Sequence, residues 1–552
     1  MAPYYIPGML LDTLSKKTAT ARTLIGCGMF GPTRPDKLVR TLKAIKDWGP
    51  TTAAGYTASA IRYPDDIAII DEAGSLTFAD VHRRTNALAH AWSDDGIVEG
   101  DNVALLCRNH RGFVEAMVAL SKLGAHALFL NTAFAAPQLT EVCEREQPRA
   151  IVYDEEFEGL IAGAAEGRRR FVAWSDSGRA PEGATLLETL IERGDPRDVV
   201  VPATKGKIVI LTSGTTGTPK GANRKQPETL DPVAGLIEKI PLRARGRTMI
   251  AAPLFHSWGL AHFILGIGLS STLVLRRRFD PEDTLRAIDE HGATALIVVP
   301  VMLQRMLELG PKTLGRYDTG SLQIIAASGS ALPGELATKV MDAFGDVLYN
   351  LYGSTEVAWA TIATPADLRA APGTAGRPPR GTVVRLYDAD DQEVGPGETG
   401  RIFVGNELCF EGYSGGGSKA VIDGLLSSGD VGHFDDGGRL FVDGRDDEMI
   451  VSGGENVFPR EVEDLLHDHE AIDEVAVIGV EDEQFGQRLR AFVVKEDDAA
   501  VSEEDLKGYV KSNLARYKVP REIVFVDELP RNATGKVLKR ELAEHQLADS
   551  PD

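Results

Sequence analysis

The stretch that decides the fold is Lys207–Ala222, which reads KIVILTSGTTGTPKGA. Its apolar, β-branched start at residues 208–211 predicts a buried strand, and the glycine- and hydroxyl-rich residues after it predict a loop. The two glycines free the backbone to curl, so that successive N–H groups can converge on an anion. The pattern therefore predicts a phosphate cradle, formed by Thr212, Ser213, Gly214, Thr215, Thr216, Gly217 and Lys220.

This loop differs from the P-loop of nucleotide triphosphatases. That motif places Gly-Lys-Ser/Thr after its variable residues, whereas here Thr218 and Pro219 separate Gly217 from Lys220. A solvated loop without a ligand is the alternative interpretation. The rest of the chain decides between the two, because a phosphate loop needs partner residues elsewhere.

Length and composition limit the protein class. A chain of 552 residues is too long for one hydrophobic core, so at least two domains are expected. With 43% hydrophobic and 26% charged residues, the chain resembles ordinary globular proteins. The net charge of −21 argues against sequence-independent binding to nucleic acid, which requires a basic surface.

Three further features predict a cytoplasmic protein. The four cysteines are scattered without CxxC pairing, which favours a reducing compartment with neither a disulfide framework nor a zinc site. The N-terminus lacks the pattern of a secretory signal. The run Trp258–Leu275 carries polar residues, so it is interpreted as a buried helix followed by a strand instead of a membrane span.

Alternating patterns predict an α/β fold with doubly wound sheets. Strands alternate with helices over residues 66–154, and apolar runs that end in polar turns return after the phosphate loop. Residues 155–206 are rich in glycine and charge and predict a surface connection. Residues 374–443 predict a β subdomain, since short strands there alternate with turn sequences. A small, mobile α+β domain is expected over residues 445–552, with its last helix starting at Gly535.

Residues 1–50 form a basic extension of the large domain, which spans 51–444. They hold eight Lys/Arg against three Asp/Glu, a local excess of five positive charges in an acidic chain. Within them, Lys37–Trp48 predicts a helix with Leu38, Leu42 and Ile45 on one face. Two interpretations are open: the helix packs on the large domain, or it lies on an anionic membrane surface.

Six more motifs follow the phosphate loop, and together the seven resemble the adenylate-forming enzymes, which include acyl-CoA synthetases, luciferases and peptide-synthetase adenylation domains. The motifs are PLFHSWG, AASGSALPGE, LYGSTE, SSGD, VDGRDDEMIVSGGENVFPREVE and PRNATGKVLKREL, in the family's order. The resemblance runs from about residue 50 to the C-terminus, and within the superfamily it is strongest to fatty-acid–CoA ligases. It implies that ATP and Mg²⁺ activate a medium- or long-chain fatty acid to acyl-AMP, which then passes to coenzyme A.

The resemblance also implies roles at the nucleotide. Lys536 would bridge the attacking carboxylate and the α-phosphate, to which Thr355 would donate a hydrogen bond. Glu356, with Thr215, would hold Mg²⁺, an ion that suits one carboxylate with phosphate oxygens and waters. Asp430 would accept from both ribose hydroxyls, with Arg445 as its basic partner. The adenine and the rest of the nucleotide would contact Gly329, Ser330, Ala331, Asn350, Tyr352 and Gly353.

Other roles concern the second half reaction and the acid. The small domain would rotate about a hinge at Asp447, bringing Ser452, Gly453 and Gly454 to the coenzyme A channel. His256 would lie between the acyl and coenzyme A channels. The acyl pocket would be formed by Trp258, Val299, Val301 and Met302. Arg276, Arg277 and Arg278 would either contact coenzyme A phosphates or form a solvated basic turn.

Several alternatives stay open at the level of sequence. The enzyme could transfer its acyl group to a separate carrier protein, or it could act on an aryl or other small carboxylic acid. A non-catalytic sensor is disfavoured, because the chain keeps Glu356, Asp430, Arg445 and Lys536 together. The sequence does not decide the oligomeric state, and it allows peripheral membrane contact through residues 1–50.

Overall fold

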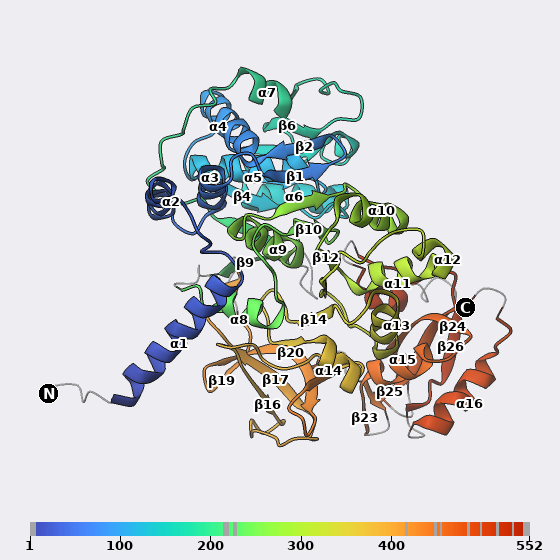
Figure 1. Cartoon of the computed structure of the whole chain (residues 1–552). Helices are drawn as coiled ribbons and strands as arrows, with labels where there is room; N and C mark the ends of the chain where they lie inside the picture. Colours follow the sequence, from blue (N-terminus) through green and yellow to red (C-terminus); the bar gives the residue numbers. More distant parts are fainter. Residues whose placement is uncertain are drawn as a thin grey trace.

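Two eight-stranded sheets form the larger part of the computed structural model (Figure 1). The first sheet has the order β15-β14-β13-β12-β10-β11-β1-β2, with parallel pairs from β14 to β1 and antiparallel strands at both edges. Its strands are β1 (Ile67–Asp71), β2 (Gly74–Thr77), β10 (Arg247–Ile250), β11 (Thr272–Leu275), β12 (Ala295–Val298), β13 (Ile324–Ala327), β14 (Leu348–Tyr352) and β15 (Thr361–Ala363). This is the predicted α/β architecture.

The second sheet has the order β18-β9-β8-β4-β3-β5-β6-β7 and is parallel from β8 to β7. Its strands are β3 (Asn102–Leu106), β4 (His126–Phe129), β5 (Ala150–Asp154), β6 (Arg169–Trp174), β7 (Ala184–Leu186), β8 (Ile208–Thr212), β9 (Lys220–Arg224) and β18 (Phe410–Tyr413). Prediction of residues 155–206 as a surface connection was wrong, because β6 and β7 extend the sheet there. Flanking arginines and glycines concealed the short apolar centre of β6, where Phe171 and Val172 are buried.

Helices between the two sheets form the main core. α3 (Thr52–Arg62) contacts α5 (Arg111–Leu123), which lies on β4, and α9 (Ser257–Gly268), which lies on β10, β11 and β12. α4 (Phe78–Asp94) packs beside α3 and α5, and its N-terminus is closed by a capping box between Thr77 and Asp80. α9 and β11 confirm the helix-then-strand interpretation of Trp258–Leu275. The remaining helices of this part are η1 (Glu155–Phe157), α6 (Ala136–Glu146), α7 (Leu187–Arg193), α8 (Asp231–Lys239), α10 (Pro281–His291), α11 (Pro300–Glu308), α12 (Gly310–Leu314), α13 (Gly334–Phe344) and α14 (Pro365–Ala370).

A third, antiparallel sheet follows in the chain. It comprises β16 (Val383–Tyr387), β17 (Gly400–Gly405), β19 (Val421–Ile422), β20 (Leu425–Phe434) and β21 (Leu440–Arg445). Its buried face forms a core of its own around Ile402, Val404 and Leu440. The strands lie where a β subdomain was expected.

The last part of the chain is α+β. Its sheet contains β22 (Ile450–Ser452), β23 (Glu455–Val457), β24 (Ile472–Asp482), β25 (Gly486–Lys495) and β26 (Glu522–Phe525), and its helices are α15 (Pro459–His467), α16 (Glu503–Asn513) and α17 (Lys539–Glu544). Ser502 and Asp505 form the capping box that begins α16. The last helix begins at Lys539, not at Gly535 as predicted. Gly535 has a φ of +77°, which a right-handed helix does not allow.

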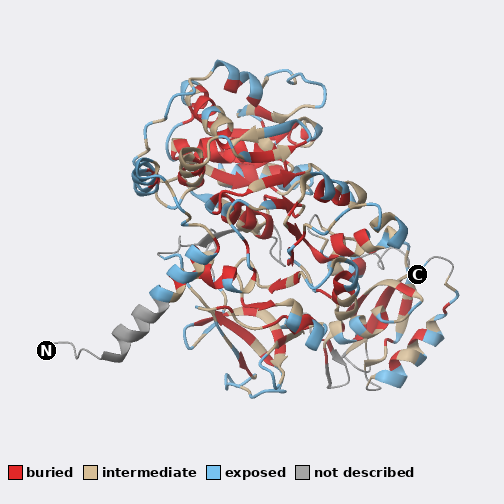
Figure 2. Ribbon diagram, viewed as in Figure 1, coloured by how far each residue is buried: buried red, intermediate tan, exposed pale blue. Residues whose placement is uncertain are grey.

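Two helices, α1 and α2, precede α3 in the chain. α1 (Pro7–Gly26) extends away from the body in Figure 1, while its inner end contacts α8. α2 (Pro35–Trp48) packs on α3 and buries Thr41, Ala44 and Trp48. One side of α2 therefore packs on the large domain. The residues of the predicted apolar stripe do not take part in this packing and are exposed, and α2 is one of the largely exposed segments in Figure 2.

The structure describes residues 7–212, 220–224, 229–413, 418–446, 450–452, 455–482, 486–496, 499–514, 518–532 and 535–544. Among these residues, no helix combines the length and the apolar character required to cross a membrane. The predicted site residues 213–217, Asp447, Gly453 and Gly454 lie outside the described ranges.

Candidate active site

A cavity of about 750 Å³ opens at the carboxyl ends of the parallel strands of the first sheet. The segments that follow β10, β12, β13 and β14 all contribute to its wall, as expected where strand ends meet a ligand crevice. The opposite wall comes from β20, β21 and the C-terminal α+β part. The cavity thus lies between three parts of the chain, and its size is typical of a small-molecule site.

Most of the described site residues predicted from the sequence meet in this cavity. Those that line it are His256, Trp258, Val299, Gly329, Ser330, Ala331, Asn350, Tyr352, Gly353, Thr355, Glu356, Asp430, Arg445 and Lys536. They are spread over almost three hundred positions of the chain. Their convergence is a result of the fold that sequence spacing alone does not show.

Asp430 is the centre of a polar cluster in the cavity wall. On β20 it is paired in register with Arg445 on β21, whose Nη1 lies 3.3 Å from its Oδ1. Tyr352, at the end of β14, donates its hydroxyl to Oδ2 of Asp430 at 2.5 Å. Burial raises the pKa of Asp430, while the Tyr352 hydrogen bond and the positive charges of Arg445 and Lys536 act to lower it. The carboxyl group is therefore held in place by the Tyr352 hydroxyl and by Arg445, with Lys536 as a second positive charge nearby.

Lys536 reaches the cavity from a short loop. Its backbone N–H donates to Oδ1 of Asn532 at 2.9 Å, and Arg531 donates to the carbonyl of Gly535 at 2.6 Å. Arg531 is held in turn by Glu474 on β24, at 2.8 Å. These bonds tie the loop to the C-terminal sheet, so the position of Lys536 follows that of the whole C-terminal part.

The loop also contacts the large domain directly. A Cβ built on Gly535 would lie 2.3 Å from Cγ1 of Val301 on α11, a distance that no side chain could occupy without movement. Close by, Gln304 donates to Asp473 at 3.2 Å, which is a second contact between the two parts. Glycine at position 535 therefore permits both the positive φ and this close approach.

Three buried polar atoms of cavity-wall residues have no hydrogen bond among the described residues, and one of them, Nε of Arg460, lies 3.5 Å from Oδ2 of Asp464. The other two are Oδ1 of Asn350, on β14, and Nε2 of His256, at the start of α9. A buried polar atom without a hydrogen bond is costly, so such atoms facing a cavity mark a place for a ligand or water. Burial lowers the pKa of His256 to about 4, which keeps the ring neutral at pH 7.

Some predicted residues lie elsewhere or cannot be placed. Val301 and Met302 are not part of the described cavity wall: Val301 packs against Gly535, and Met302 is buried in the main core. Arg276 pairs with Asp283, while Arg277 and Arg278 pair with Glu156, so the arginine triplet is engaged in ion pairs. Thr212, Lys220 and Ser452 lie in strands β8, β9 and β22, whose side chains at these positions are not described.

Sequence reasoning missed several residues of the wall: Trp359, Lys419, Arg460, Arg531 and Lys539. Arg531 and Lys539 lie in the motif that contains Lys536, so proximity to that motif was the available signal. Lys419 has no such signal, because it lies between recognisable motifs. Including these residues, the described part of the cavity wall carries six basic side chains and three carboxylates, in a chain of net charge −21. The local excess of positive charge suits anionic ligands.

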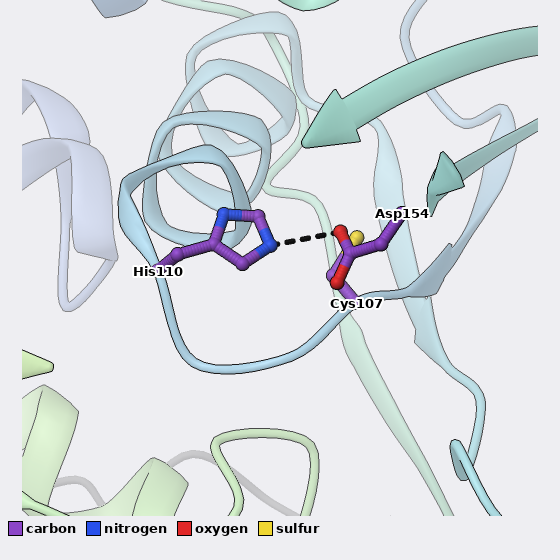
Figure 3. Close-up of side chains that lie close together, drawn as sticks. All are labelled: Cys107, His110 and Asp154. Carbon is purple, nitrogen blue, oxygen red and sulfur yellow. Dashed lines mark hydrogen bonds and ion pairs between the residues drawn. The ribbon is translucent and has the colours of Figure 1, made fainter. Parts of the chain in front are cut away.

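A second polar cluster, away from this cavity, comprises Cys107, His110 and Asp154 (Figure 3). Their candidate ligand atoms all lie within 4.8 Å of one another, and all three side chains are buried. Nδ1 of His110 accepts the N–H of Gly112 at 3.1 Å, so the ring proton is on Nε2, which donates to Asp154 at 2.8 Å. Nε2 therefore has no lone pair for a metal, and the cluster is a hydrogen-bonded cap at the start of α5.

Comparison with known proteins agrees with this geometry. The family model of AMP-binding enzymes matches residues 56–414, and the model of the AMP-binding enzyme C-terminal domain matches 461–536. An indoleacetate–CoA ligase of Aromatoleum aromaticum is 34% identical over 87% of this chain and 94% of its own. A feruloyl-CoA synthase of an Amycolatopsis species is 31% identical over 87% of this chain and 96% of its own. The crystal structure of the anthranilate CoA ligase AuaEII with anthranoyl-AMP superposes with a TM-score of 0.80 and 25% identity, covering 90% of this chain and 98% of its own.

Proposed function

The chain belongs to the family of AMP-binding enzymes, within the adenylate-forming superfamily, and we propose that it is an AMP-forming CoA ligase for an aromatic carboxylic acid. ATP would activate the acid to an acyl-AMP with release of pyrophosphate, and coenzyme A would then displace AMP. The observation that carries this proposal is the convergence of Asp430, Thr355 and Lys536 in one cavity with an excess of basic side chains.

The geometry supports a distinct task for each group around the nucleotide. Asp430, oriented by Tyr352 and Arg445, offers carboxylate oxygens that suit the vicinal hydroxyls of ribose. The amide of Asn350, whose Oδ1 lacks a partner among the described residues, suits the amino group of adenine. Gly353 cannot carry a side chain, because a Cβ there would lie 2.0 Å from the carbonyl of Ala358.

Lys536 would act on the first half reaction. Acid and ATP are both anions, so a cation between the attacking carboxylate and the α-phosphate favours the transition state. The approach of its loop to Val301 and the hydrogen bond from Gln304 to Asp473 support a closed arrangement in which this lysine is delivered. Movement of the C-terminal part about the predicted hinge at Asp447 would withdraw it for the transfer to coenzyme A.

Glu356 would hold the Mg²⁺ that accompanies ATP. A single carboxylate in a cavity with room for phosphate oxygens and waters fits this ion, which keeps several of its waters when bound. The ion would neutralise charge on the phosphates. The predicted second residue, Thr215, lies outside the described ranges.

An aromatic substrate is favoured over a fatty acid for two reasons. The cavity wall includes Trp258, Trp359 and the neutral ring of His256, which offer flat apolar surfaces to an aromatic acid. Trp258 is fixed, since its indole N–H donates to the carbonyl of Val298 at 3.0 Å. The names of the relatives compared above also refer to aromatic acids. A fatty acid is the second candidate substrate, because the described cavity wall also includes the aliphatic side chains of Leu236, Ala261 and Val299, which could contact an alkyl chain.

The direct test measures coenzyme A-dependent AMP release over a panel of acids. Benzoate, cinnamate, ferulate and indoleacetate would be compared with acetate, octanoate and oleate. A maximum among the aromatic acids is expected, and a maximum at oleate would favour the fatty-acid alternative. Pyrophosphate release without consumption of coenzyme A would instead indicate a carrier-protein acceptor.

A further inference from the structure

We propose that helix α2 docks this protein on anionic lipid membranes. Four of its apolar residues form what we term the α2 face: Leu38, Val39, Leu42 and Ile45, which are 45%, 67%, 56% and 45% exposed. Ile25 and Phe30, just before α2, are also exposed. These six are among only fifteen large hydrophobic residues exposed in the described part of the chain. Four of the six lie on one helix, and an exposed apolar group of this kind marks an interaction surface.

The α2 face is rigidly presented. The opposite side of the helix buries Thr41, Ala44 and Trp48 against the large domain. At one end, Nζ of Lys37 donates to the carbonyl of Arg62 at 2.9 Å, and at the other Lys205 donates to the carbonyl of Asp47 at 2.8 Å. The apolar residues thus cannot turn inward without breaking these contacts, so they need an external partner.

Charge identifies the partner as an anionic surface. Arg40, Lys43 and Lys46 are exposed on α2 and outnumber its two exposed acids, Asp36 and Asp47. Arg34, just before the helix, is also exposed and pairs with Asp36. On a membrane, these long side chains would reach the phosphates while the apolar residues enter the acyl boundary. The basic excess of residues 1–50 contrasts with the net charge of −21 of the whole chain. That charge would repel a membrane from other parts of the molecule, which fixes the orientation of docking.

Vesicle sedimentation of the full chain tests the proposal. Vesicles of phosphatidylcholine alone would be compared with vesicles in which about one third of the lipid is phosphatidylglycerol. The paired change Leu42→Glu and Ile45→Glu should reduce binding to the anionic vesicles at least about tenfold, because it puts charge into the acyl boundary. Lys43→Glu with Lys46→Glu should reduce it similarly, and high salt should weaken binding of the unaltered chain.

Matched controls are available on the antiparallel third sheet. Val383→Glu with Val421→Glu changes two residues that are 49% and 59% exposed, and it should leave vesicle binding unchanged. All changed positions are exposed, so urea midpoints should stay the same. Absence of binding to anionic vesicles, or equal binding by the Leu42 and Ile45 variant, would overturn the proposal. A dimer in solution that dissociates in that variant, without vesicle binding, would assign the α2 face to a second copy of the chain.

Discussion

Asp430 and Asp154 are both carboxylates held by neighbouring donors, yet their surroundings differ in one respect. Asp154 is fully buried and accepts from His110 and from the backbone N–H of Arg108, at 2.8 and 2.9 Å. Asp430 is 13% exposed and lies in a cavity wall that also contains the amide oxygen of Asn350, which has no hydrogen-bond partner among the described residues. The first group completes its bonds within the protein, whereas the second faces space for a ligand.

The comparison shows how to separate structural from functional polar clusters. Proximity of a cysteine, a histidine and an aspartate suggests metal chemistry or a nucleophile, but hydrogen-bond directions at His110 assign its proton and exclude that interpretation. The cavity shows the opposite pattern, since its polar groups come from three parts of the chain and several carry positive charge. Substitutions in the cluster around Asp154 should therefore affect stability, and substitutions in the cavity around Asp430 should affect catalysis.

The largest expected effect is on stability at the structural cluster. His110→Ala removes the partner of buried Asp154 and should lower the free energy of unfolding by about 3–5 kcal/mol. The comparison variant His256→Ala should cost only about 1 kcal/mol, because His256 borders a cavity and its Nε2 has no partner among the described residues. Urea unfolding measures both. If both variants lose the same unfolding free energy, the two clusters do not differ as described. A drop in melting temperature on addition of EDTA would instead support a metal site at Cys107, His110 and Asp154.

Alternating sequence patterns predicted the doubly wound sheets, and the resemblance of the seven motifs to the adenylate-forming enzymes suggested the site residues. Many of these residues share one cavity because they follow the ends of neighbouring parallel strands. The sequence could not show where Val301 lies. An apolar residue at the start of a helix gives the same sequence pattern whether its side chain faces a pocket or another domain. The sequence also predicted that Lys536 begins a helix. The structure shows a loop there instead, held by hydrogen bonds from Arg531 to Gly535 and from Lys536 to Asn532, and these bonds cannot be seen in the sequence. Three residues of the α2 face, Leu38, Leu42 and Ile45, were predicted as an apolar stripe, but their exposure depends on which side of the helix packs against α3.

A second prediction concerns pH. Burial lowers the pKa of His256 and His262 from 6.5 to about 4, so between these values the unfolded chain binds more protons than the folded chain. Stability should therefore rise from pH 4 to pH 6.5 and then level off, with a contribution of up to about 3 kcal/mol from each histidine. Urea midpoints measured across this range, with His262→Gln as comparison, check the prediction. If the urea midpoint rises with pH as steeply in His262→Gln as in the unaltered chain, the prediction is wrong.

Asp430→Asn should affect catalysis and spare stability. Loss of one carboxylate oxygen as an acceptor should raise the KM for ATP about 100-fold, a change of about 2.7 kcal/mol. Because burial raises the pKa of Asp430, a neutral residue there should leave the urea midpoint nearly unchanged. Asp154→Asn is the matched variant and should show the reverse pattern. If both variants change KM alike, the two carboxylates do not differ in the way described.

The smallest effect is expected where the two parts meet. Gly535→Ala would place a Cβ against Val301 and strain a positive φ, so it should slow acid activation about tenfold. Addition of Val301→Ala should recover part of the loss by removing the clash. Pyrophosphate exchange measures both variants. Full activity of Gly535→Ala would show that this contact is not needed for activation.

The most direct measurement separates the two half reactions in Lys536→Ala. Acid-dependent ATP–pyrophosphate exchange reports activation, and thioester formation from supplied acyl-AMP and coenzyme A reports transfer. Activation should fall at least about 100-fold while transfer stays near the original rate, because the proposed role of the lysine is limited to the step in which the carboxylate meets the α-phosphate. Lys312→Ala, at an exposed position on α12, should change neither rate. Equal loss of both half reactions, or unchanged activation, would contradict the assignment of this cavity as the active site that Lys536 completes.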